Sequence, residues 1–474
     1  MSKGLCEIVN FSTLIFIWVF LPIVLIGYYI IRCVCKGNLI KNYWLLICSL
    51  FFYAWGEGRY IIILLCVIGI SFFGGRCIYR TKKAWLKNLV LSLTIVVLLL
   101  CLGYYKYFND IRLIFLHESG SVHLPIGISF FTFQAISFLL DVYRGEVDIS
   151  GLRIGSYALY ISFFPQLIAG PIIKYKDIEE QIRCRAENIE MLSEGIHFFI
   201  IGLFRKVIIA NNVALVVDSI YGLSDSDVTC LFSWIAAIFY TLQIYFDFSG
   251  YSLMAIGLGK MFGFNIVQNF DKPYLSKSIS EFWRRWHISL GSWFRDYLYI
   301  PLGGNKKGEI RTYVNLALVF LVTGIWHGSG YTFLLWGCFY AFWIVLERIV
   351  RNSKKLSRIT SSIPRIFKYM YSILIVVFGW VIFRAESLHR LKIMIVRMVM
   401  PFSNITSHYS LFEFVNHKQF VMLLIAIVWI FVIERKDIKI KNRLLGLCFD
   451  TGALLWCLIA LTGEAYNPFI YFRF

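Results

Sequence analysis

The sequence predicts an all-α, polytopic integral membrane protein, and two observations carry this prediction. Of its 474 residues, 59% are hydrophobic and only 16% are charged, whereas soluble domains are typically about 45–50% apolar and about 25% charged. The apolar residues also recur in long uncharged runs along the whole chain, so we expect one polytopic transmembrane domain covering residues 1–474. A soluble enzyme is excluded.

Each uncharged run is compared with the length of about 20 residues that a helix needs to cross a bilayer. The first run, Phe11–Ile31, is too long for the core of a signal peptide and no small-residue cleavage site follows it, so we expect a retained first helix. The later runs lie between these polar residues, the last run being interrupted by Asp450: Lys41 and Glu57, Arg59 and Arg76, Lys87 and Lys106, His123 and Asp141, Arg153 and Lys174, Asp227 and Asp247, Arg311 and Glu347, Lys368 and Arg384, Lys418 and Glu434, and Arg443 and Glu464. Their lengths predict 11 to 13 crossings.

Two apolar stretches differ from simple spans. The run from Ile154 to Ile173 contains Pro165 and the pair Gly170-Pro171, and such breakers at membrane depth need protein or a water-filled cavity to satisfy the freed backbone groups. We expect a re-entrant segment there. The stretch from Phe248 to Gly263 is short and contains four glycines, which predicts a broken or partly inserted helix.

The charge balance predicts the orientation. The chain has 47 Lys and Arg against 28 Asp and Glu, a formal net charge of +19, and such an excess in a membrane protein marks the cytoplasmic loops. The basic loops at residues 32–41 and 76–87 are separated by two spans, so both fit the cytoplasmic side. We therefore expect a multi-pass protein of the cytoplasmic (inner) membrane with its N-terminus outside, and no nucleic-acid partner.

The same count of crossings assigns two further segments to the outside. The connection at residues 218–227 carries three aspartates and no Lys or Arg, as an external loop should. Residues 384–397 are basic although the count places them outside as well, and their apolar spacing predicts a helix lying along the interface.

His327 is the first candidate for chemistry, because an ionisable group inside a membrane is costly unless it is paired or functional. It lies almost midway in the uncharged run from Thr312 to Leu346, which predicts a helical hairpin with its turn at residues 328–330. The helical rise from Thr312 to His327 is about 22 Å, against a hydrocarbon core of about 30 Å, so we expect the imidazole inside the membrane. A histidine that only packs between helices is the alternative, but the small residues beside it leave room for a substrate or close helix contact.

His287 is the second candidate. It lies in the stretch Glu281–Tyr299, which mixes tryptophans with arginines and has no long apolar run, as in an amphipathic segment at the interface or beside a polar cavity. Taken as a helix, the stretch places Arg284, His287 and Gly291 on one face. Because guanidinium groups match phosphate oxygens, this face could hold a phosphorylated ligand, and an aromatic anchor on lipid phosphates explains the stretch equally well.

The remaining motifs indicate little by themselves. The loop at residues 301–308 contains Gly303-Gly304 and the pair Lys306-Lys307, which could meet phosphates, but it does not match a P-loop. The sequence contains no HExxH, GxSxG or paired-carboxylate motif and no CxxC pair. We therefore expect no metal and no tightly bound cofactor.

Six blocks stand in order along the chain: residues 124–134 (LPIGISFFTFQ), 164–171 (FPQLIAGP), 243–252 (QIYFDFSGYS), 281–305, 326–328 (WHG) and 469–474 (FIYFRF). Together they resemble the membrane-bound O-acyltransferases (the MBOAT family), and within them the bacterial branch of alginate O-acetylation membrane proteins. The resemblance covers nearly the whole chain. It implies an O-acyltransferase that moves an acetyl group from cytosolic acetyl-CoA, the donor substrate, toward hydroxyls of a cell-envelope polysaccharide.

In this family an intramembrane histidine matching His327 is the presumed catalytic residue, and His287 matches the second characteristic histidine. A neutral imidazole can take the proton from an attacking hydroxyl. We expect the Trp326 indole or a backbone amide to stabilise the oxyanion, and an acyl-histidine intermediate is also compatible with these residues.

The resemblance also implies partners. Four basic residues would lie on the cytoplasmic side, suited to the phosphates of CoA: Arg284, Arg285, Lys306 and Lys307. Acetylating systems of this family typically include a second, exported acetyltransferase that finishes the transfer, so we expect such a partner.

Three alternatives remain open at this point. Within the same family, the chain could transfer D-alanine to teichoic acid from an acylated carrier protein. Outside it, broken helices and intramembrane histidines also occur in multi-span transporters and flippases, which need no thioester donor. A structural scaffold for an envelope complex would not depend on His327.

Overall fold

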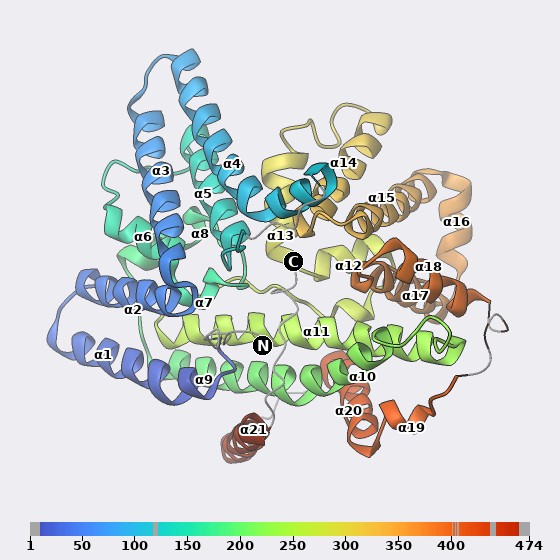
Figure 1. The fold of residues 1–474 in the computed structure, drawn as a ribbon. Helices are drawn as coiled ribbons and strands as arrows, with labels where there is room; N and C mark the ends of the chain where they lie inside the picture. The colour runs from blue at the N-terminus through green and yellow to red at the C-terminus, as the bar shows by residue number, and fades with distance from the viewer. Residues whose placement is uncertain are drawn as a thin grey trace. The chain divides into compact units, whose positions relative to one another are not determined.

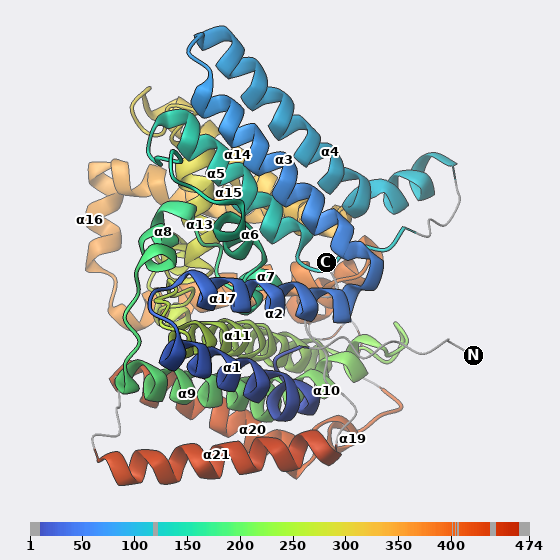
Figure 2. The ribbon, with the colours of Figure 1, turned by 90° about the vertical axis from the view of Figure 1, so that its left-hand side faces the viewer.

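The described residues of this computed structural model are 10–116, 122–400, 402, 404, 407–436 and 442–463. They form helices joined by turns and loops, with no strand among them, which confirms the all-α prediction (Figures 1 and 2). Ten segments within this part of the chain are long and apolar enough to cross a membrane. One of the ten, Leu39–Arg80, contains two long helices. When these are counted separately, the described residues offer 11 candidate crossings, the lower end of the predicted 11 to 13.

The chain divides into two compact units. The first contains Met1–Gly202 and Tyr251–Gln268, and the second contains Leu203–Gly250 and Asn269–Phe474. Both α9 and α11 contribute residues to each unit. The expectation of a single transmembrane domain stays a prediction.

The first unit contains mainly long apolar helices. They are η1 (Phe16–Phe20), α1 (Leu21–Val34), α2 (Leu39–Glu57), η2 (Gly58–Tyr60), α3 (Ile61–Arg80), α4 (Ala84–Leu116), α5 (Ile128–Arg144), α6 (Ile154–Ser162), α7 (Phe164–Leu167), α8 (Tyr175–Arg183) and most of α9 (Ile189–Phe204). Large apolar side chains of α4, such as Leu93 and Leu100, are exposed, as expected of a helix that faces lipid.

A polar cluster in the first unit neutralises part of the basic loop at residues 32–41. Glu187 Oε1 accepts hydrogen bonds from Lys41 Nζ at 2.7 Å and from the Tyr28 hydroxyl at 2.6 Å. Arg32 Nε lies 3.4 Å from Glu187 Oε2. Because Glu187 is far from these residues in the sequence, the charge pattern did not reveal this pairing.

The predicted break in the run Ile154–Ile173 is confirmed. Helix α6 ends at Ser162, α7 is a single turn, and no helix follows until α8 begins at Tyr175. Protein groups satisfy the freed backbone, since the Phe164 amide donates to Ser49 Oγ at 3.1 Å and the Gln166 side chain donates to the Tyr160 carbonyl. That this segment re-enters the membrane from one side stays a prediction.

The prediction of a broken helix at residues 248–263 is wrong. These residues belong largely to α11 (Cys230–Met261), which is continuous over 32 residues. Its glycines allow close helix contact: a Cβ on Gly257 would lie 2.5 Å from the backbone oxygen of Gly195 on α9. Glycines in a membrane helix can therefore mark a contact surface where sequence reasoning expects a break.

The second unit holds the remaining helices. They are η3 (Arg205–Ala210), α10 (Asn211–Tyr221), most of α11, η4 (Pro273–Leu275), α12 (Ile279–Arg285), α13 (Ile288–Phe294), η5 (Arg295–Tyr299), α14 (Glu309–His327), α15 (Tyr331–Asn352), α16 (Lys354–Ser362), α17 (Arg365–Arg384), α18 (Leu388–Val399), α19 (Leu411–Phe414), α20 (His417–Val428), η6 (Trp429–Glu434) and α21 (Arg443–Gly463).

Helices α14 and α15 form the predicted hairpin, with its turn at residues 328–330. Their backbones approach closely at two glycines. A Cβ on Gly324 would lie 2.5 Å from the Phe333 oxygen, and one on Gly337 would lie 2.7 Å from the Phe320 oxygen. The small residues therefore hold the two helices together and fix the end of α14, where His327 lies.

The acidic connection at 218–227 and the basic segment at 384–397 lie side by side. Arg384 Nη2 lies 2.8 Å from Asp218 Oδ1, and Arg390 Nη1 lies 2.9 Å from Asp225 Oδ1. The basic segment is helical as predicted, and α18 buries one apolar stripe. Because these ion pairs join the two segments, both belong to the same side of the protein, which explains how basic residues can accompany an acidic loop.

Candidate active site

His327 is the last residue of α14, and its side chain is buried. The ring packs edge to face against two aromatic side chains, with centroid distances of 5.2 Å to Trp336 on α15 and 5.1 Å to Phe383 on α17. The chain is helical from Thr312 to His327, as was assumed when the depth of the imidazole was predicted from the helical rise. Three helices of the second unit thus position this imidazole.

His287 lies at a break in the chain, which corrects the prediction of one helix carrying Arg284, His287 and Gly291 on a single face. Helix α12 ends at Arg285 and α13 begins at Ile288. Between them, His287 has a left-handed backbone, with φ 47° and ψ 51°, a conformation that few residues other than glycine adopt. The break turns the imidazole inward and leaves Arg284 exposed.

Residues 269–271 hold this break in place. The Ile288 amide donates to the Asn269 backbone oxygen at 3.0 Å, and the Asp271 amide donates to the Arg285 oxygen at 2.9 Å. The side-chain oxygen of Asn269 lies 3.2 Å from His287 Nδ1 and accepts a hydrogen bond from Ser289 Oγ at 2.9 Å. Asn269 therefore contacts both the backbone and the ring of the turn that presents His287.

A carboxylate fixes the other end of α12. Glu347 on α15 accepts hydrogen bonds from two backbone amides at the helix N-terminus, Ile279 at 2.6 Å and Ser280 at 2.8 Å. An anion at this end is favourable because the first amides of a helix have no partner within the helix. The contact fixes α12, which carries Trp283, relative to the His327 hairpin.

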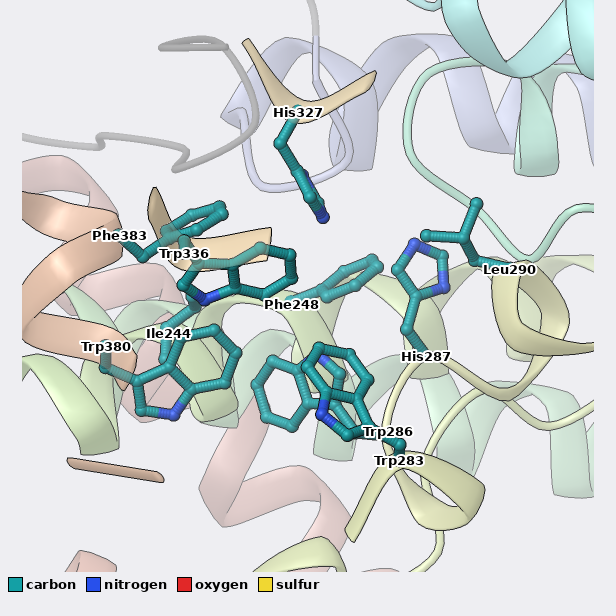
Figure 3. Close-up of a pocket in the computed structure, with 10 residues that line it drawn as sticks. All are labelled: Ile244, Phe248, Trp283, Trp286, His287, Leu290, His327, Trp336, Trp380 and Phe383. Atoms are coloured by element: carbon teal, nitrogen blue, oxygen red, sulfur yellow. The ribbon is translucent and has the colours of Figure 1, made fainter. Parts of the chain in front are cut away.

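The two histidines line one cavity. The space that protein atoms do not fill is about 340 Å³ when the solvent open to it is included, and ten residues of the second unit line it: Ile244, Phe248, Trp283, Trp286, His287, Leu290, His327, Trp336, Trp380 and Phe383. Figure 3 shows the imidazoles of His287 and His327 reaching into it from different sides, with the aromatic rings around them. The cavity is a largely apolar chamber lined by two imidazoles and four indoles.

Burial controls the protonation of His287. Loss of solvation lowers the pKa of this imidazole to about 3, because a buried cation lacks the stabilisation that water gives it. The Phe248 ring packs against it with a centroid distance of 4.7 Å. His287 is therefore neutral over the whole physiological range of pH.

The other predicted site residues lie outside this lining. Trp326 is buried, with ring centroids 6.4 Å from His287 and 4.8 Å from His327. Arg285 pairs with Glu281 at 2.9 Å. Arg284, Lys306 and Lys307 are exposed. The structure thus brings the two histidines together and keeps the four basic residues out of the cavity.

Three other histidines pair with carboxylates near the surface. His123 pairs with Glu57 at 2.9 Å, His389 with Asp225 at 2.7 Å and His408 with Asp227 at 2.8 Å. Hydrogen bonds from Ser224 and His408 hold the pKa of Asp227 at about 2. His117 lies outside the described residues.

Sequence reasoning missed the neighbours of the two histidines. Asn269 lies in no motif that indicates chemistry, and the tryptophans that line the cavity resemble an aromatic belt in the sequence. Among the described residues no group of three or more His, Cys, Asp or Glu side chains could hold a metal ion. The one usable signal was the unusual density of tryptophan around His287.

Comparison with known proteins extends this description. The sequence pattern of MBOAT, the membrane-bound O-acyltransferase family, matches residues 50–388. The chain is 42% identical to a probable alginate O-acetylase of Pseudomonas putida, over 80% of this chain and 78% of that protein. It is 35% identical to a peptidoglycan O-acetyltransferase of Helicobacter pylori, over 80% and 77%, and 27% identical to a teichoic acid D-alanyltransferase of Bacillus subtilis, over 56% and 69%.

All ten residues that line the cavity fall within the matched range. The match covers most of the chain, and the relatives that it resembles over four-fifths of its length are acyl-transferring enzymes by name. The chain therefore belongs to the membrane-bound O-acyltransferase family and is a multi-pass membrane acyltransferase.

Proposed function

We propose that this acyltransferase is an O-acetyltransferase that moves an acetyl group from cytosolic acetyl-CoA toward hydroxyls of a cell-envelope polysaccharide. The observation that carries the proposal is the cavity in which His287 and His327 meet. Relatives named for O-acetylation of alginate and of peptidoglycan support a polysaccharide acceptor. Because the chain belongs to an acyltransferase family, transport and scaffolding are not proposed as its main activity.

The cavity lining supports acetyl over D-alanyl transfer. A D-alanyl group carries an ammonium, which is costly to bury without an opposite charge. None of the ten lining residues is acidic, and eight of them are apolar or aromatic side chains other than histidine. An acetyl group needs no such charge. The lower identity to a teichoic acid D-alanyltransferase agrees with this preference.

In the proposed reaction His327 acts as the general base. Its neutral imidazole takes the proton of the attacking hydroxyl while the hydroxyl oxygen bonds to the thioester carbonyl carbon. The tetrahedral oxyanion then collapses, the C–S bond breaks, and the proton passes from the imidazolium to the leaving thiolate. The Trp326 indole, buried next to His327, stays our candidate for oxyanion stabilisation together with backbone amides.

The exposed basic residues suit the donor. Acetyl-CoA is polyanionic, and Arg284, Lys306 and Lys307 are free to meet solvent, where opposite charge raises the local concentration of a ligand. In the proposed orientation the N-terminus lies outside and these residues face the cytoplasm. The acetyl donor would then reach the cavity of His327 from the inner side, and an exported acetyltransferase would complete the transfer of the acetyl group to the glycan.

The test follows radiolabel from acetyl-CoA in membranes that carry the wild-type protein, His327→Ala or Leu334→Ala. Leu334 lies on the same hairpin and is 41% exposed, so its variant controls for expression and handling. Label is expected in the envelope glycan fraction for the wild type and the control and to be abolished in His327→Ala. If label moves only from a D-alanyl carrier protein, the donor assignment is wrong; if His327→Ala transfers acetyl normally, the base assignment is wrong.

A further inference from the structure

We propose that Asn269 is a positioning residue that selects the neutral tautomer of His287, so that Nδ1 carries the ring proton and Nε2 carries the lone pair. The inference concerns the site described above, and its activity test rests on the proposed function. Asn269 lies 18 positions before His287. Both side chains are buried, with Asn269 fully inaccessible.

The hydrogen bonds around Asn269 identify which of its side-chain atoms faces the ring. The backbone amide of Ser289 lies 3.1 Å from Asn269 Oδ1, and a backbone N–H can only donate. The atom at that position must therefore be the amide oxygen, because the amide nitrogen would place two donors face to face. An amide oxygen is in turn only an acceptor.

The tautomer of His287 follows from this identification. His287 Nδ1 lies 3.2 Å from the same oxygen, within the range of an N–H···O hydrogen bond. Because the oxygen can only accept, Nδ1 must donate and must hold the ring proton. In a neutral imidazole the other nitrogen, Nε2, then carries the lone pair.

The backbone conformation of His287 also depends on Asn269. Asn269 holds the left-handed turn at His287 with a backbone hydrogen bond from Ile288 at 3.0 Å, while its side chain holds the ring. A non-glycine residue in this conformation costs about 1–3 kcal/mol and persists where its surroundings fix it. Asn269 supplies those surroundings on both sides of the turn.

A neutral partner also matters for the charge of the ring. Burial keeps the pKa of His287 low, and an amide does not oppose this effect, whereas a carboxylate in its place would favour the imidazolium. Asn269 therefore orients the ring without making it a stronger base. His287 is then suited to accept a hydrogen bond at Nε2 from a hydroxyl or thiol in the cavity.

The charged residues on the segments around His287 pair with one another or lie toward solvent. On α11, Asp247 next to Phe248 pairs with Lys206 at 2.7 Å, and on α12, Arg285 pairs with Glu281. Shortly after Asn269 in the chain, Asp271 is exposed and Lys272 is partly exposed. On α14, the titratable residue that shares the cavity is His327.

The direct test is nitrogen NMR of the full-length protein, labelled with 15N-histidine and held in lipid nanodiscs. The His287→Asn variant identifies the His287 signals by their disappearance, since asparagine tolerates a left-handed backbone. In the wild type we expect a protonated Nδ1 and an unprotonated Nε2, unchanged between pH 5 and 9. A protonated Nε2 in the neutral wild-type ring would overturn the proposal whether or not the protein transfers acetyl groups.

Three variants separate positioning from folding. Asn269→Asp keeps the shape and adds a charge, so we expect His287 to become protonated on both nitrogens at neutral pH. Asn269→Ala removes the acceptor, and we expect the signals to change to a mixture of tautomers. Ser289→Ala removes one other hydrogen bond to the same oxygen and is the control that should keep the wild-type tautomer. If Asn269→Ala keeps it as well, Asn269 does not select the tautomer.

The activity arm measures acetyl transfer against pH for the same variants. We expect Asn269→Ala to lower kcat about 100-fold, the lower end of the contribution of a positioned acid–base group, with little change in KM. We expect the acidic limb of the Asn269→Asp profile to move to higher pH, while Ser289→Ala follows the wild type. A profile that is unchanged in Asn269→Asp, in a protein whose ring is shown to be protonated, would remove His287 from the reaction.

Discussion

Lys206 Nζ lies 2.7 Å from Asp247 Oδ1, and both side chains are only 2% exposed. The pair joins η3 to α11 in the second unit, one position before Phe248, whose ring packs on His287. Lys206 Nζ also lies 3.0 Å from Asn211 Oδ1. A charge in this position depends on its partner, because neither ion has access to water.

Loss of one partner of this pair should therefore destabilise the protein more than loss of both. We expect Lys206→Met to lower the free energy of unfolding by about 3–5 kcal/mol, because it leaves the Asp247 carboxylate buried without its cation. The double variant Lys206→Met/Asp247→Leu should recover much of that loss. Thermal unfolding in detergent gives the comparison, and losses that simply add in the double variant would contradict the coupling.

The close contact between α14 and α15 predicts a cost for a single methyl group. In Gly337→Ala the new Cβ would lie 2.7 Å from the Phe320 backbone oxygen. We therefore expect the free energy of unfolding to fall by about 1–3 kcal/mol. Gly452→Ala on α21 is the matched control, since nothing lies within 4 Å of its Cβ position. The control should be neutral or slightly stabilising. Equal melting temperatures for the two variants would show that the helices do not need this contact.

A substitution in the cavity lining tests whether the acyl group binds there. Ile244 lines the cavity from α11 and is buried, so Ile244→Ala should make room for a longer chain. We expect the ratio of kcat/KM for propionyl-CoA to that for acetyl-CoA to rise about tenfold, since one methylene in an apolar pocket changes specificity by roughly 10–200-fold. Leu334→Ala serves again as the control on the exposed face. An unchanged ratio in Ile244→Ala would place the acyl group elsewhere.

The low pKa of His287 predicts how stability depends on pH. The folded-state pKa is about 3 and the unfolded value is about 6.5, so between these values the unfolded chain binds more protons. Stability contributed by the neutral ring is therefore complete above pH 6.5 and declines as the pH falls toward 3. At pH 5 the loss amounts to about 2 kcal/mol.

His287→Asn, which has no titrating ring, should abolish this part of the pH dependence. The measurement is the melting temperature of both proteins in detergent between pH 7 and 4.5. The wild type should lose more of its melting temperature across this range than the variant does. Parallel curves for the two proteins would mean that His287 has the same pKa in the folded and unfolded states, and would contradict the low folded-state pKa.

Much of the fold and one half of the site could be predicted from the sequence. The uncharged run from Thr312 to Leu346, with its small residues in the middle, predicted the hairpin and placed His327 at its turn. His287 was found by its tryptophan-rich context, but the helix assigned to it was wrong. A left-handed residue between two short helices leaves no mark in the spacing of apolar residues.

The glycines show a second limit of predicting structure from the sequence. At residues 328–330 they form a turn, whereas in α11 they belong to a continuous helix and allow contact with Gly195. A glycine fits both roles because it has no Cβ. The sequence shows the absence of a side chain, and only the neighbouring helix determines whether the space becomes a turn or a contact.

The sequence by itself determined the membrane location and the helical class and singled out His327, because hydropathy and helix length are properties of neighbouring residues. The tertiary structure decided which groups meet: Arg384 with Asp218 across 166 positions, and Asn269 with His287 across a break in the helix. Such hydrogen bonds and ion pairs depend on the packing of distant segments. The protonation of His287 was decided at that level too, since burial and the partner of its ring nitrogen arise only in the folded chain.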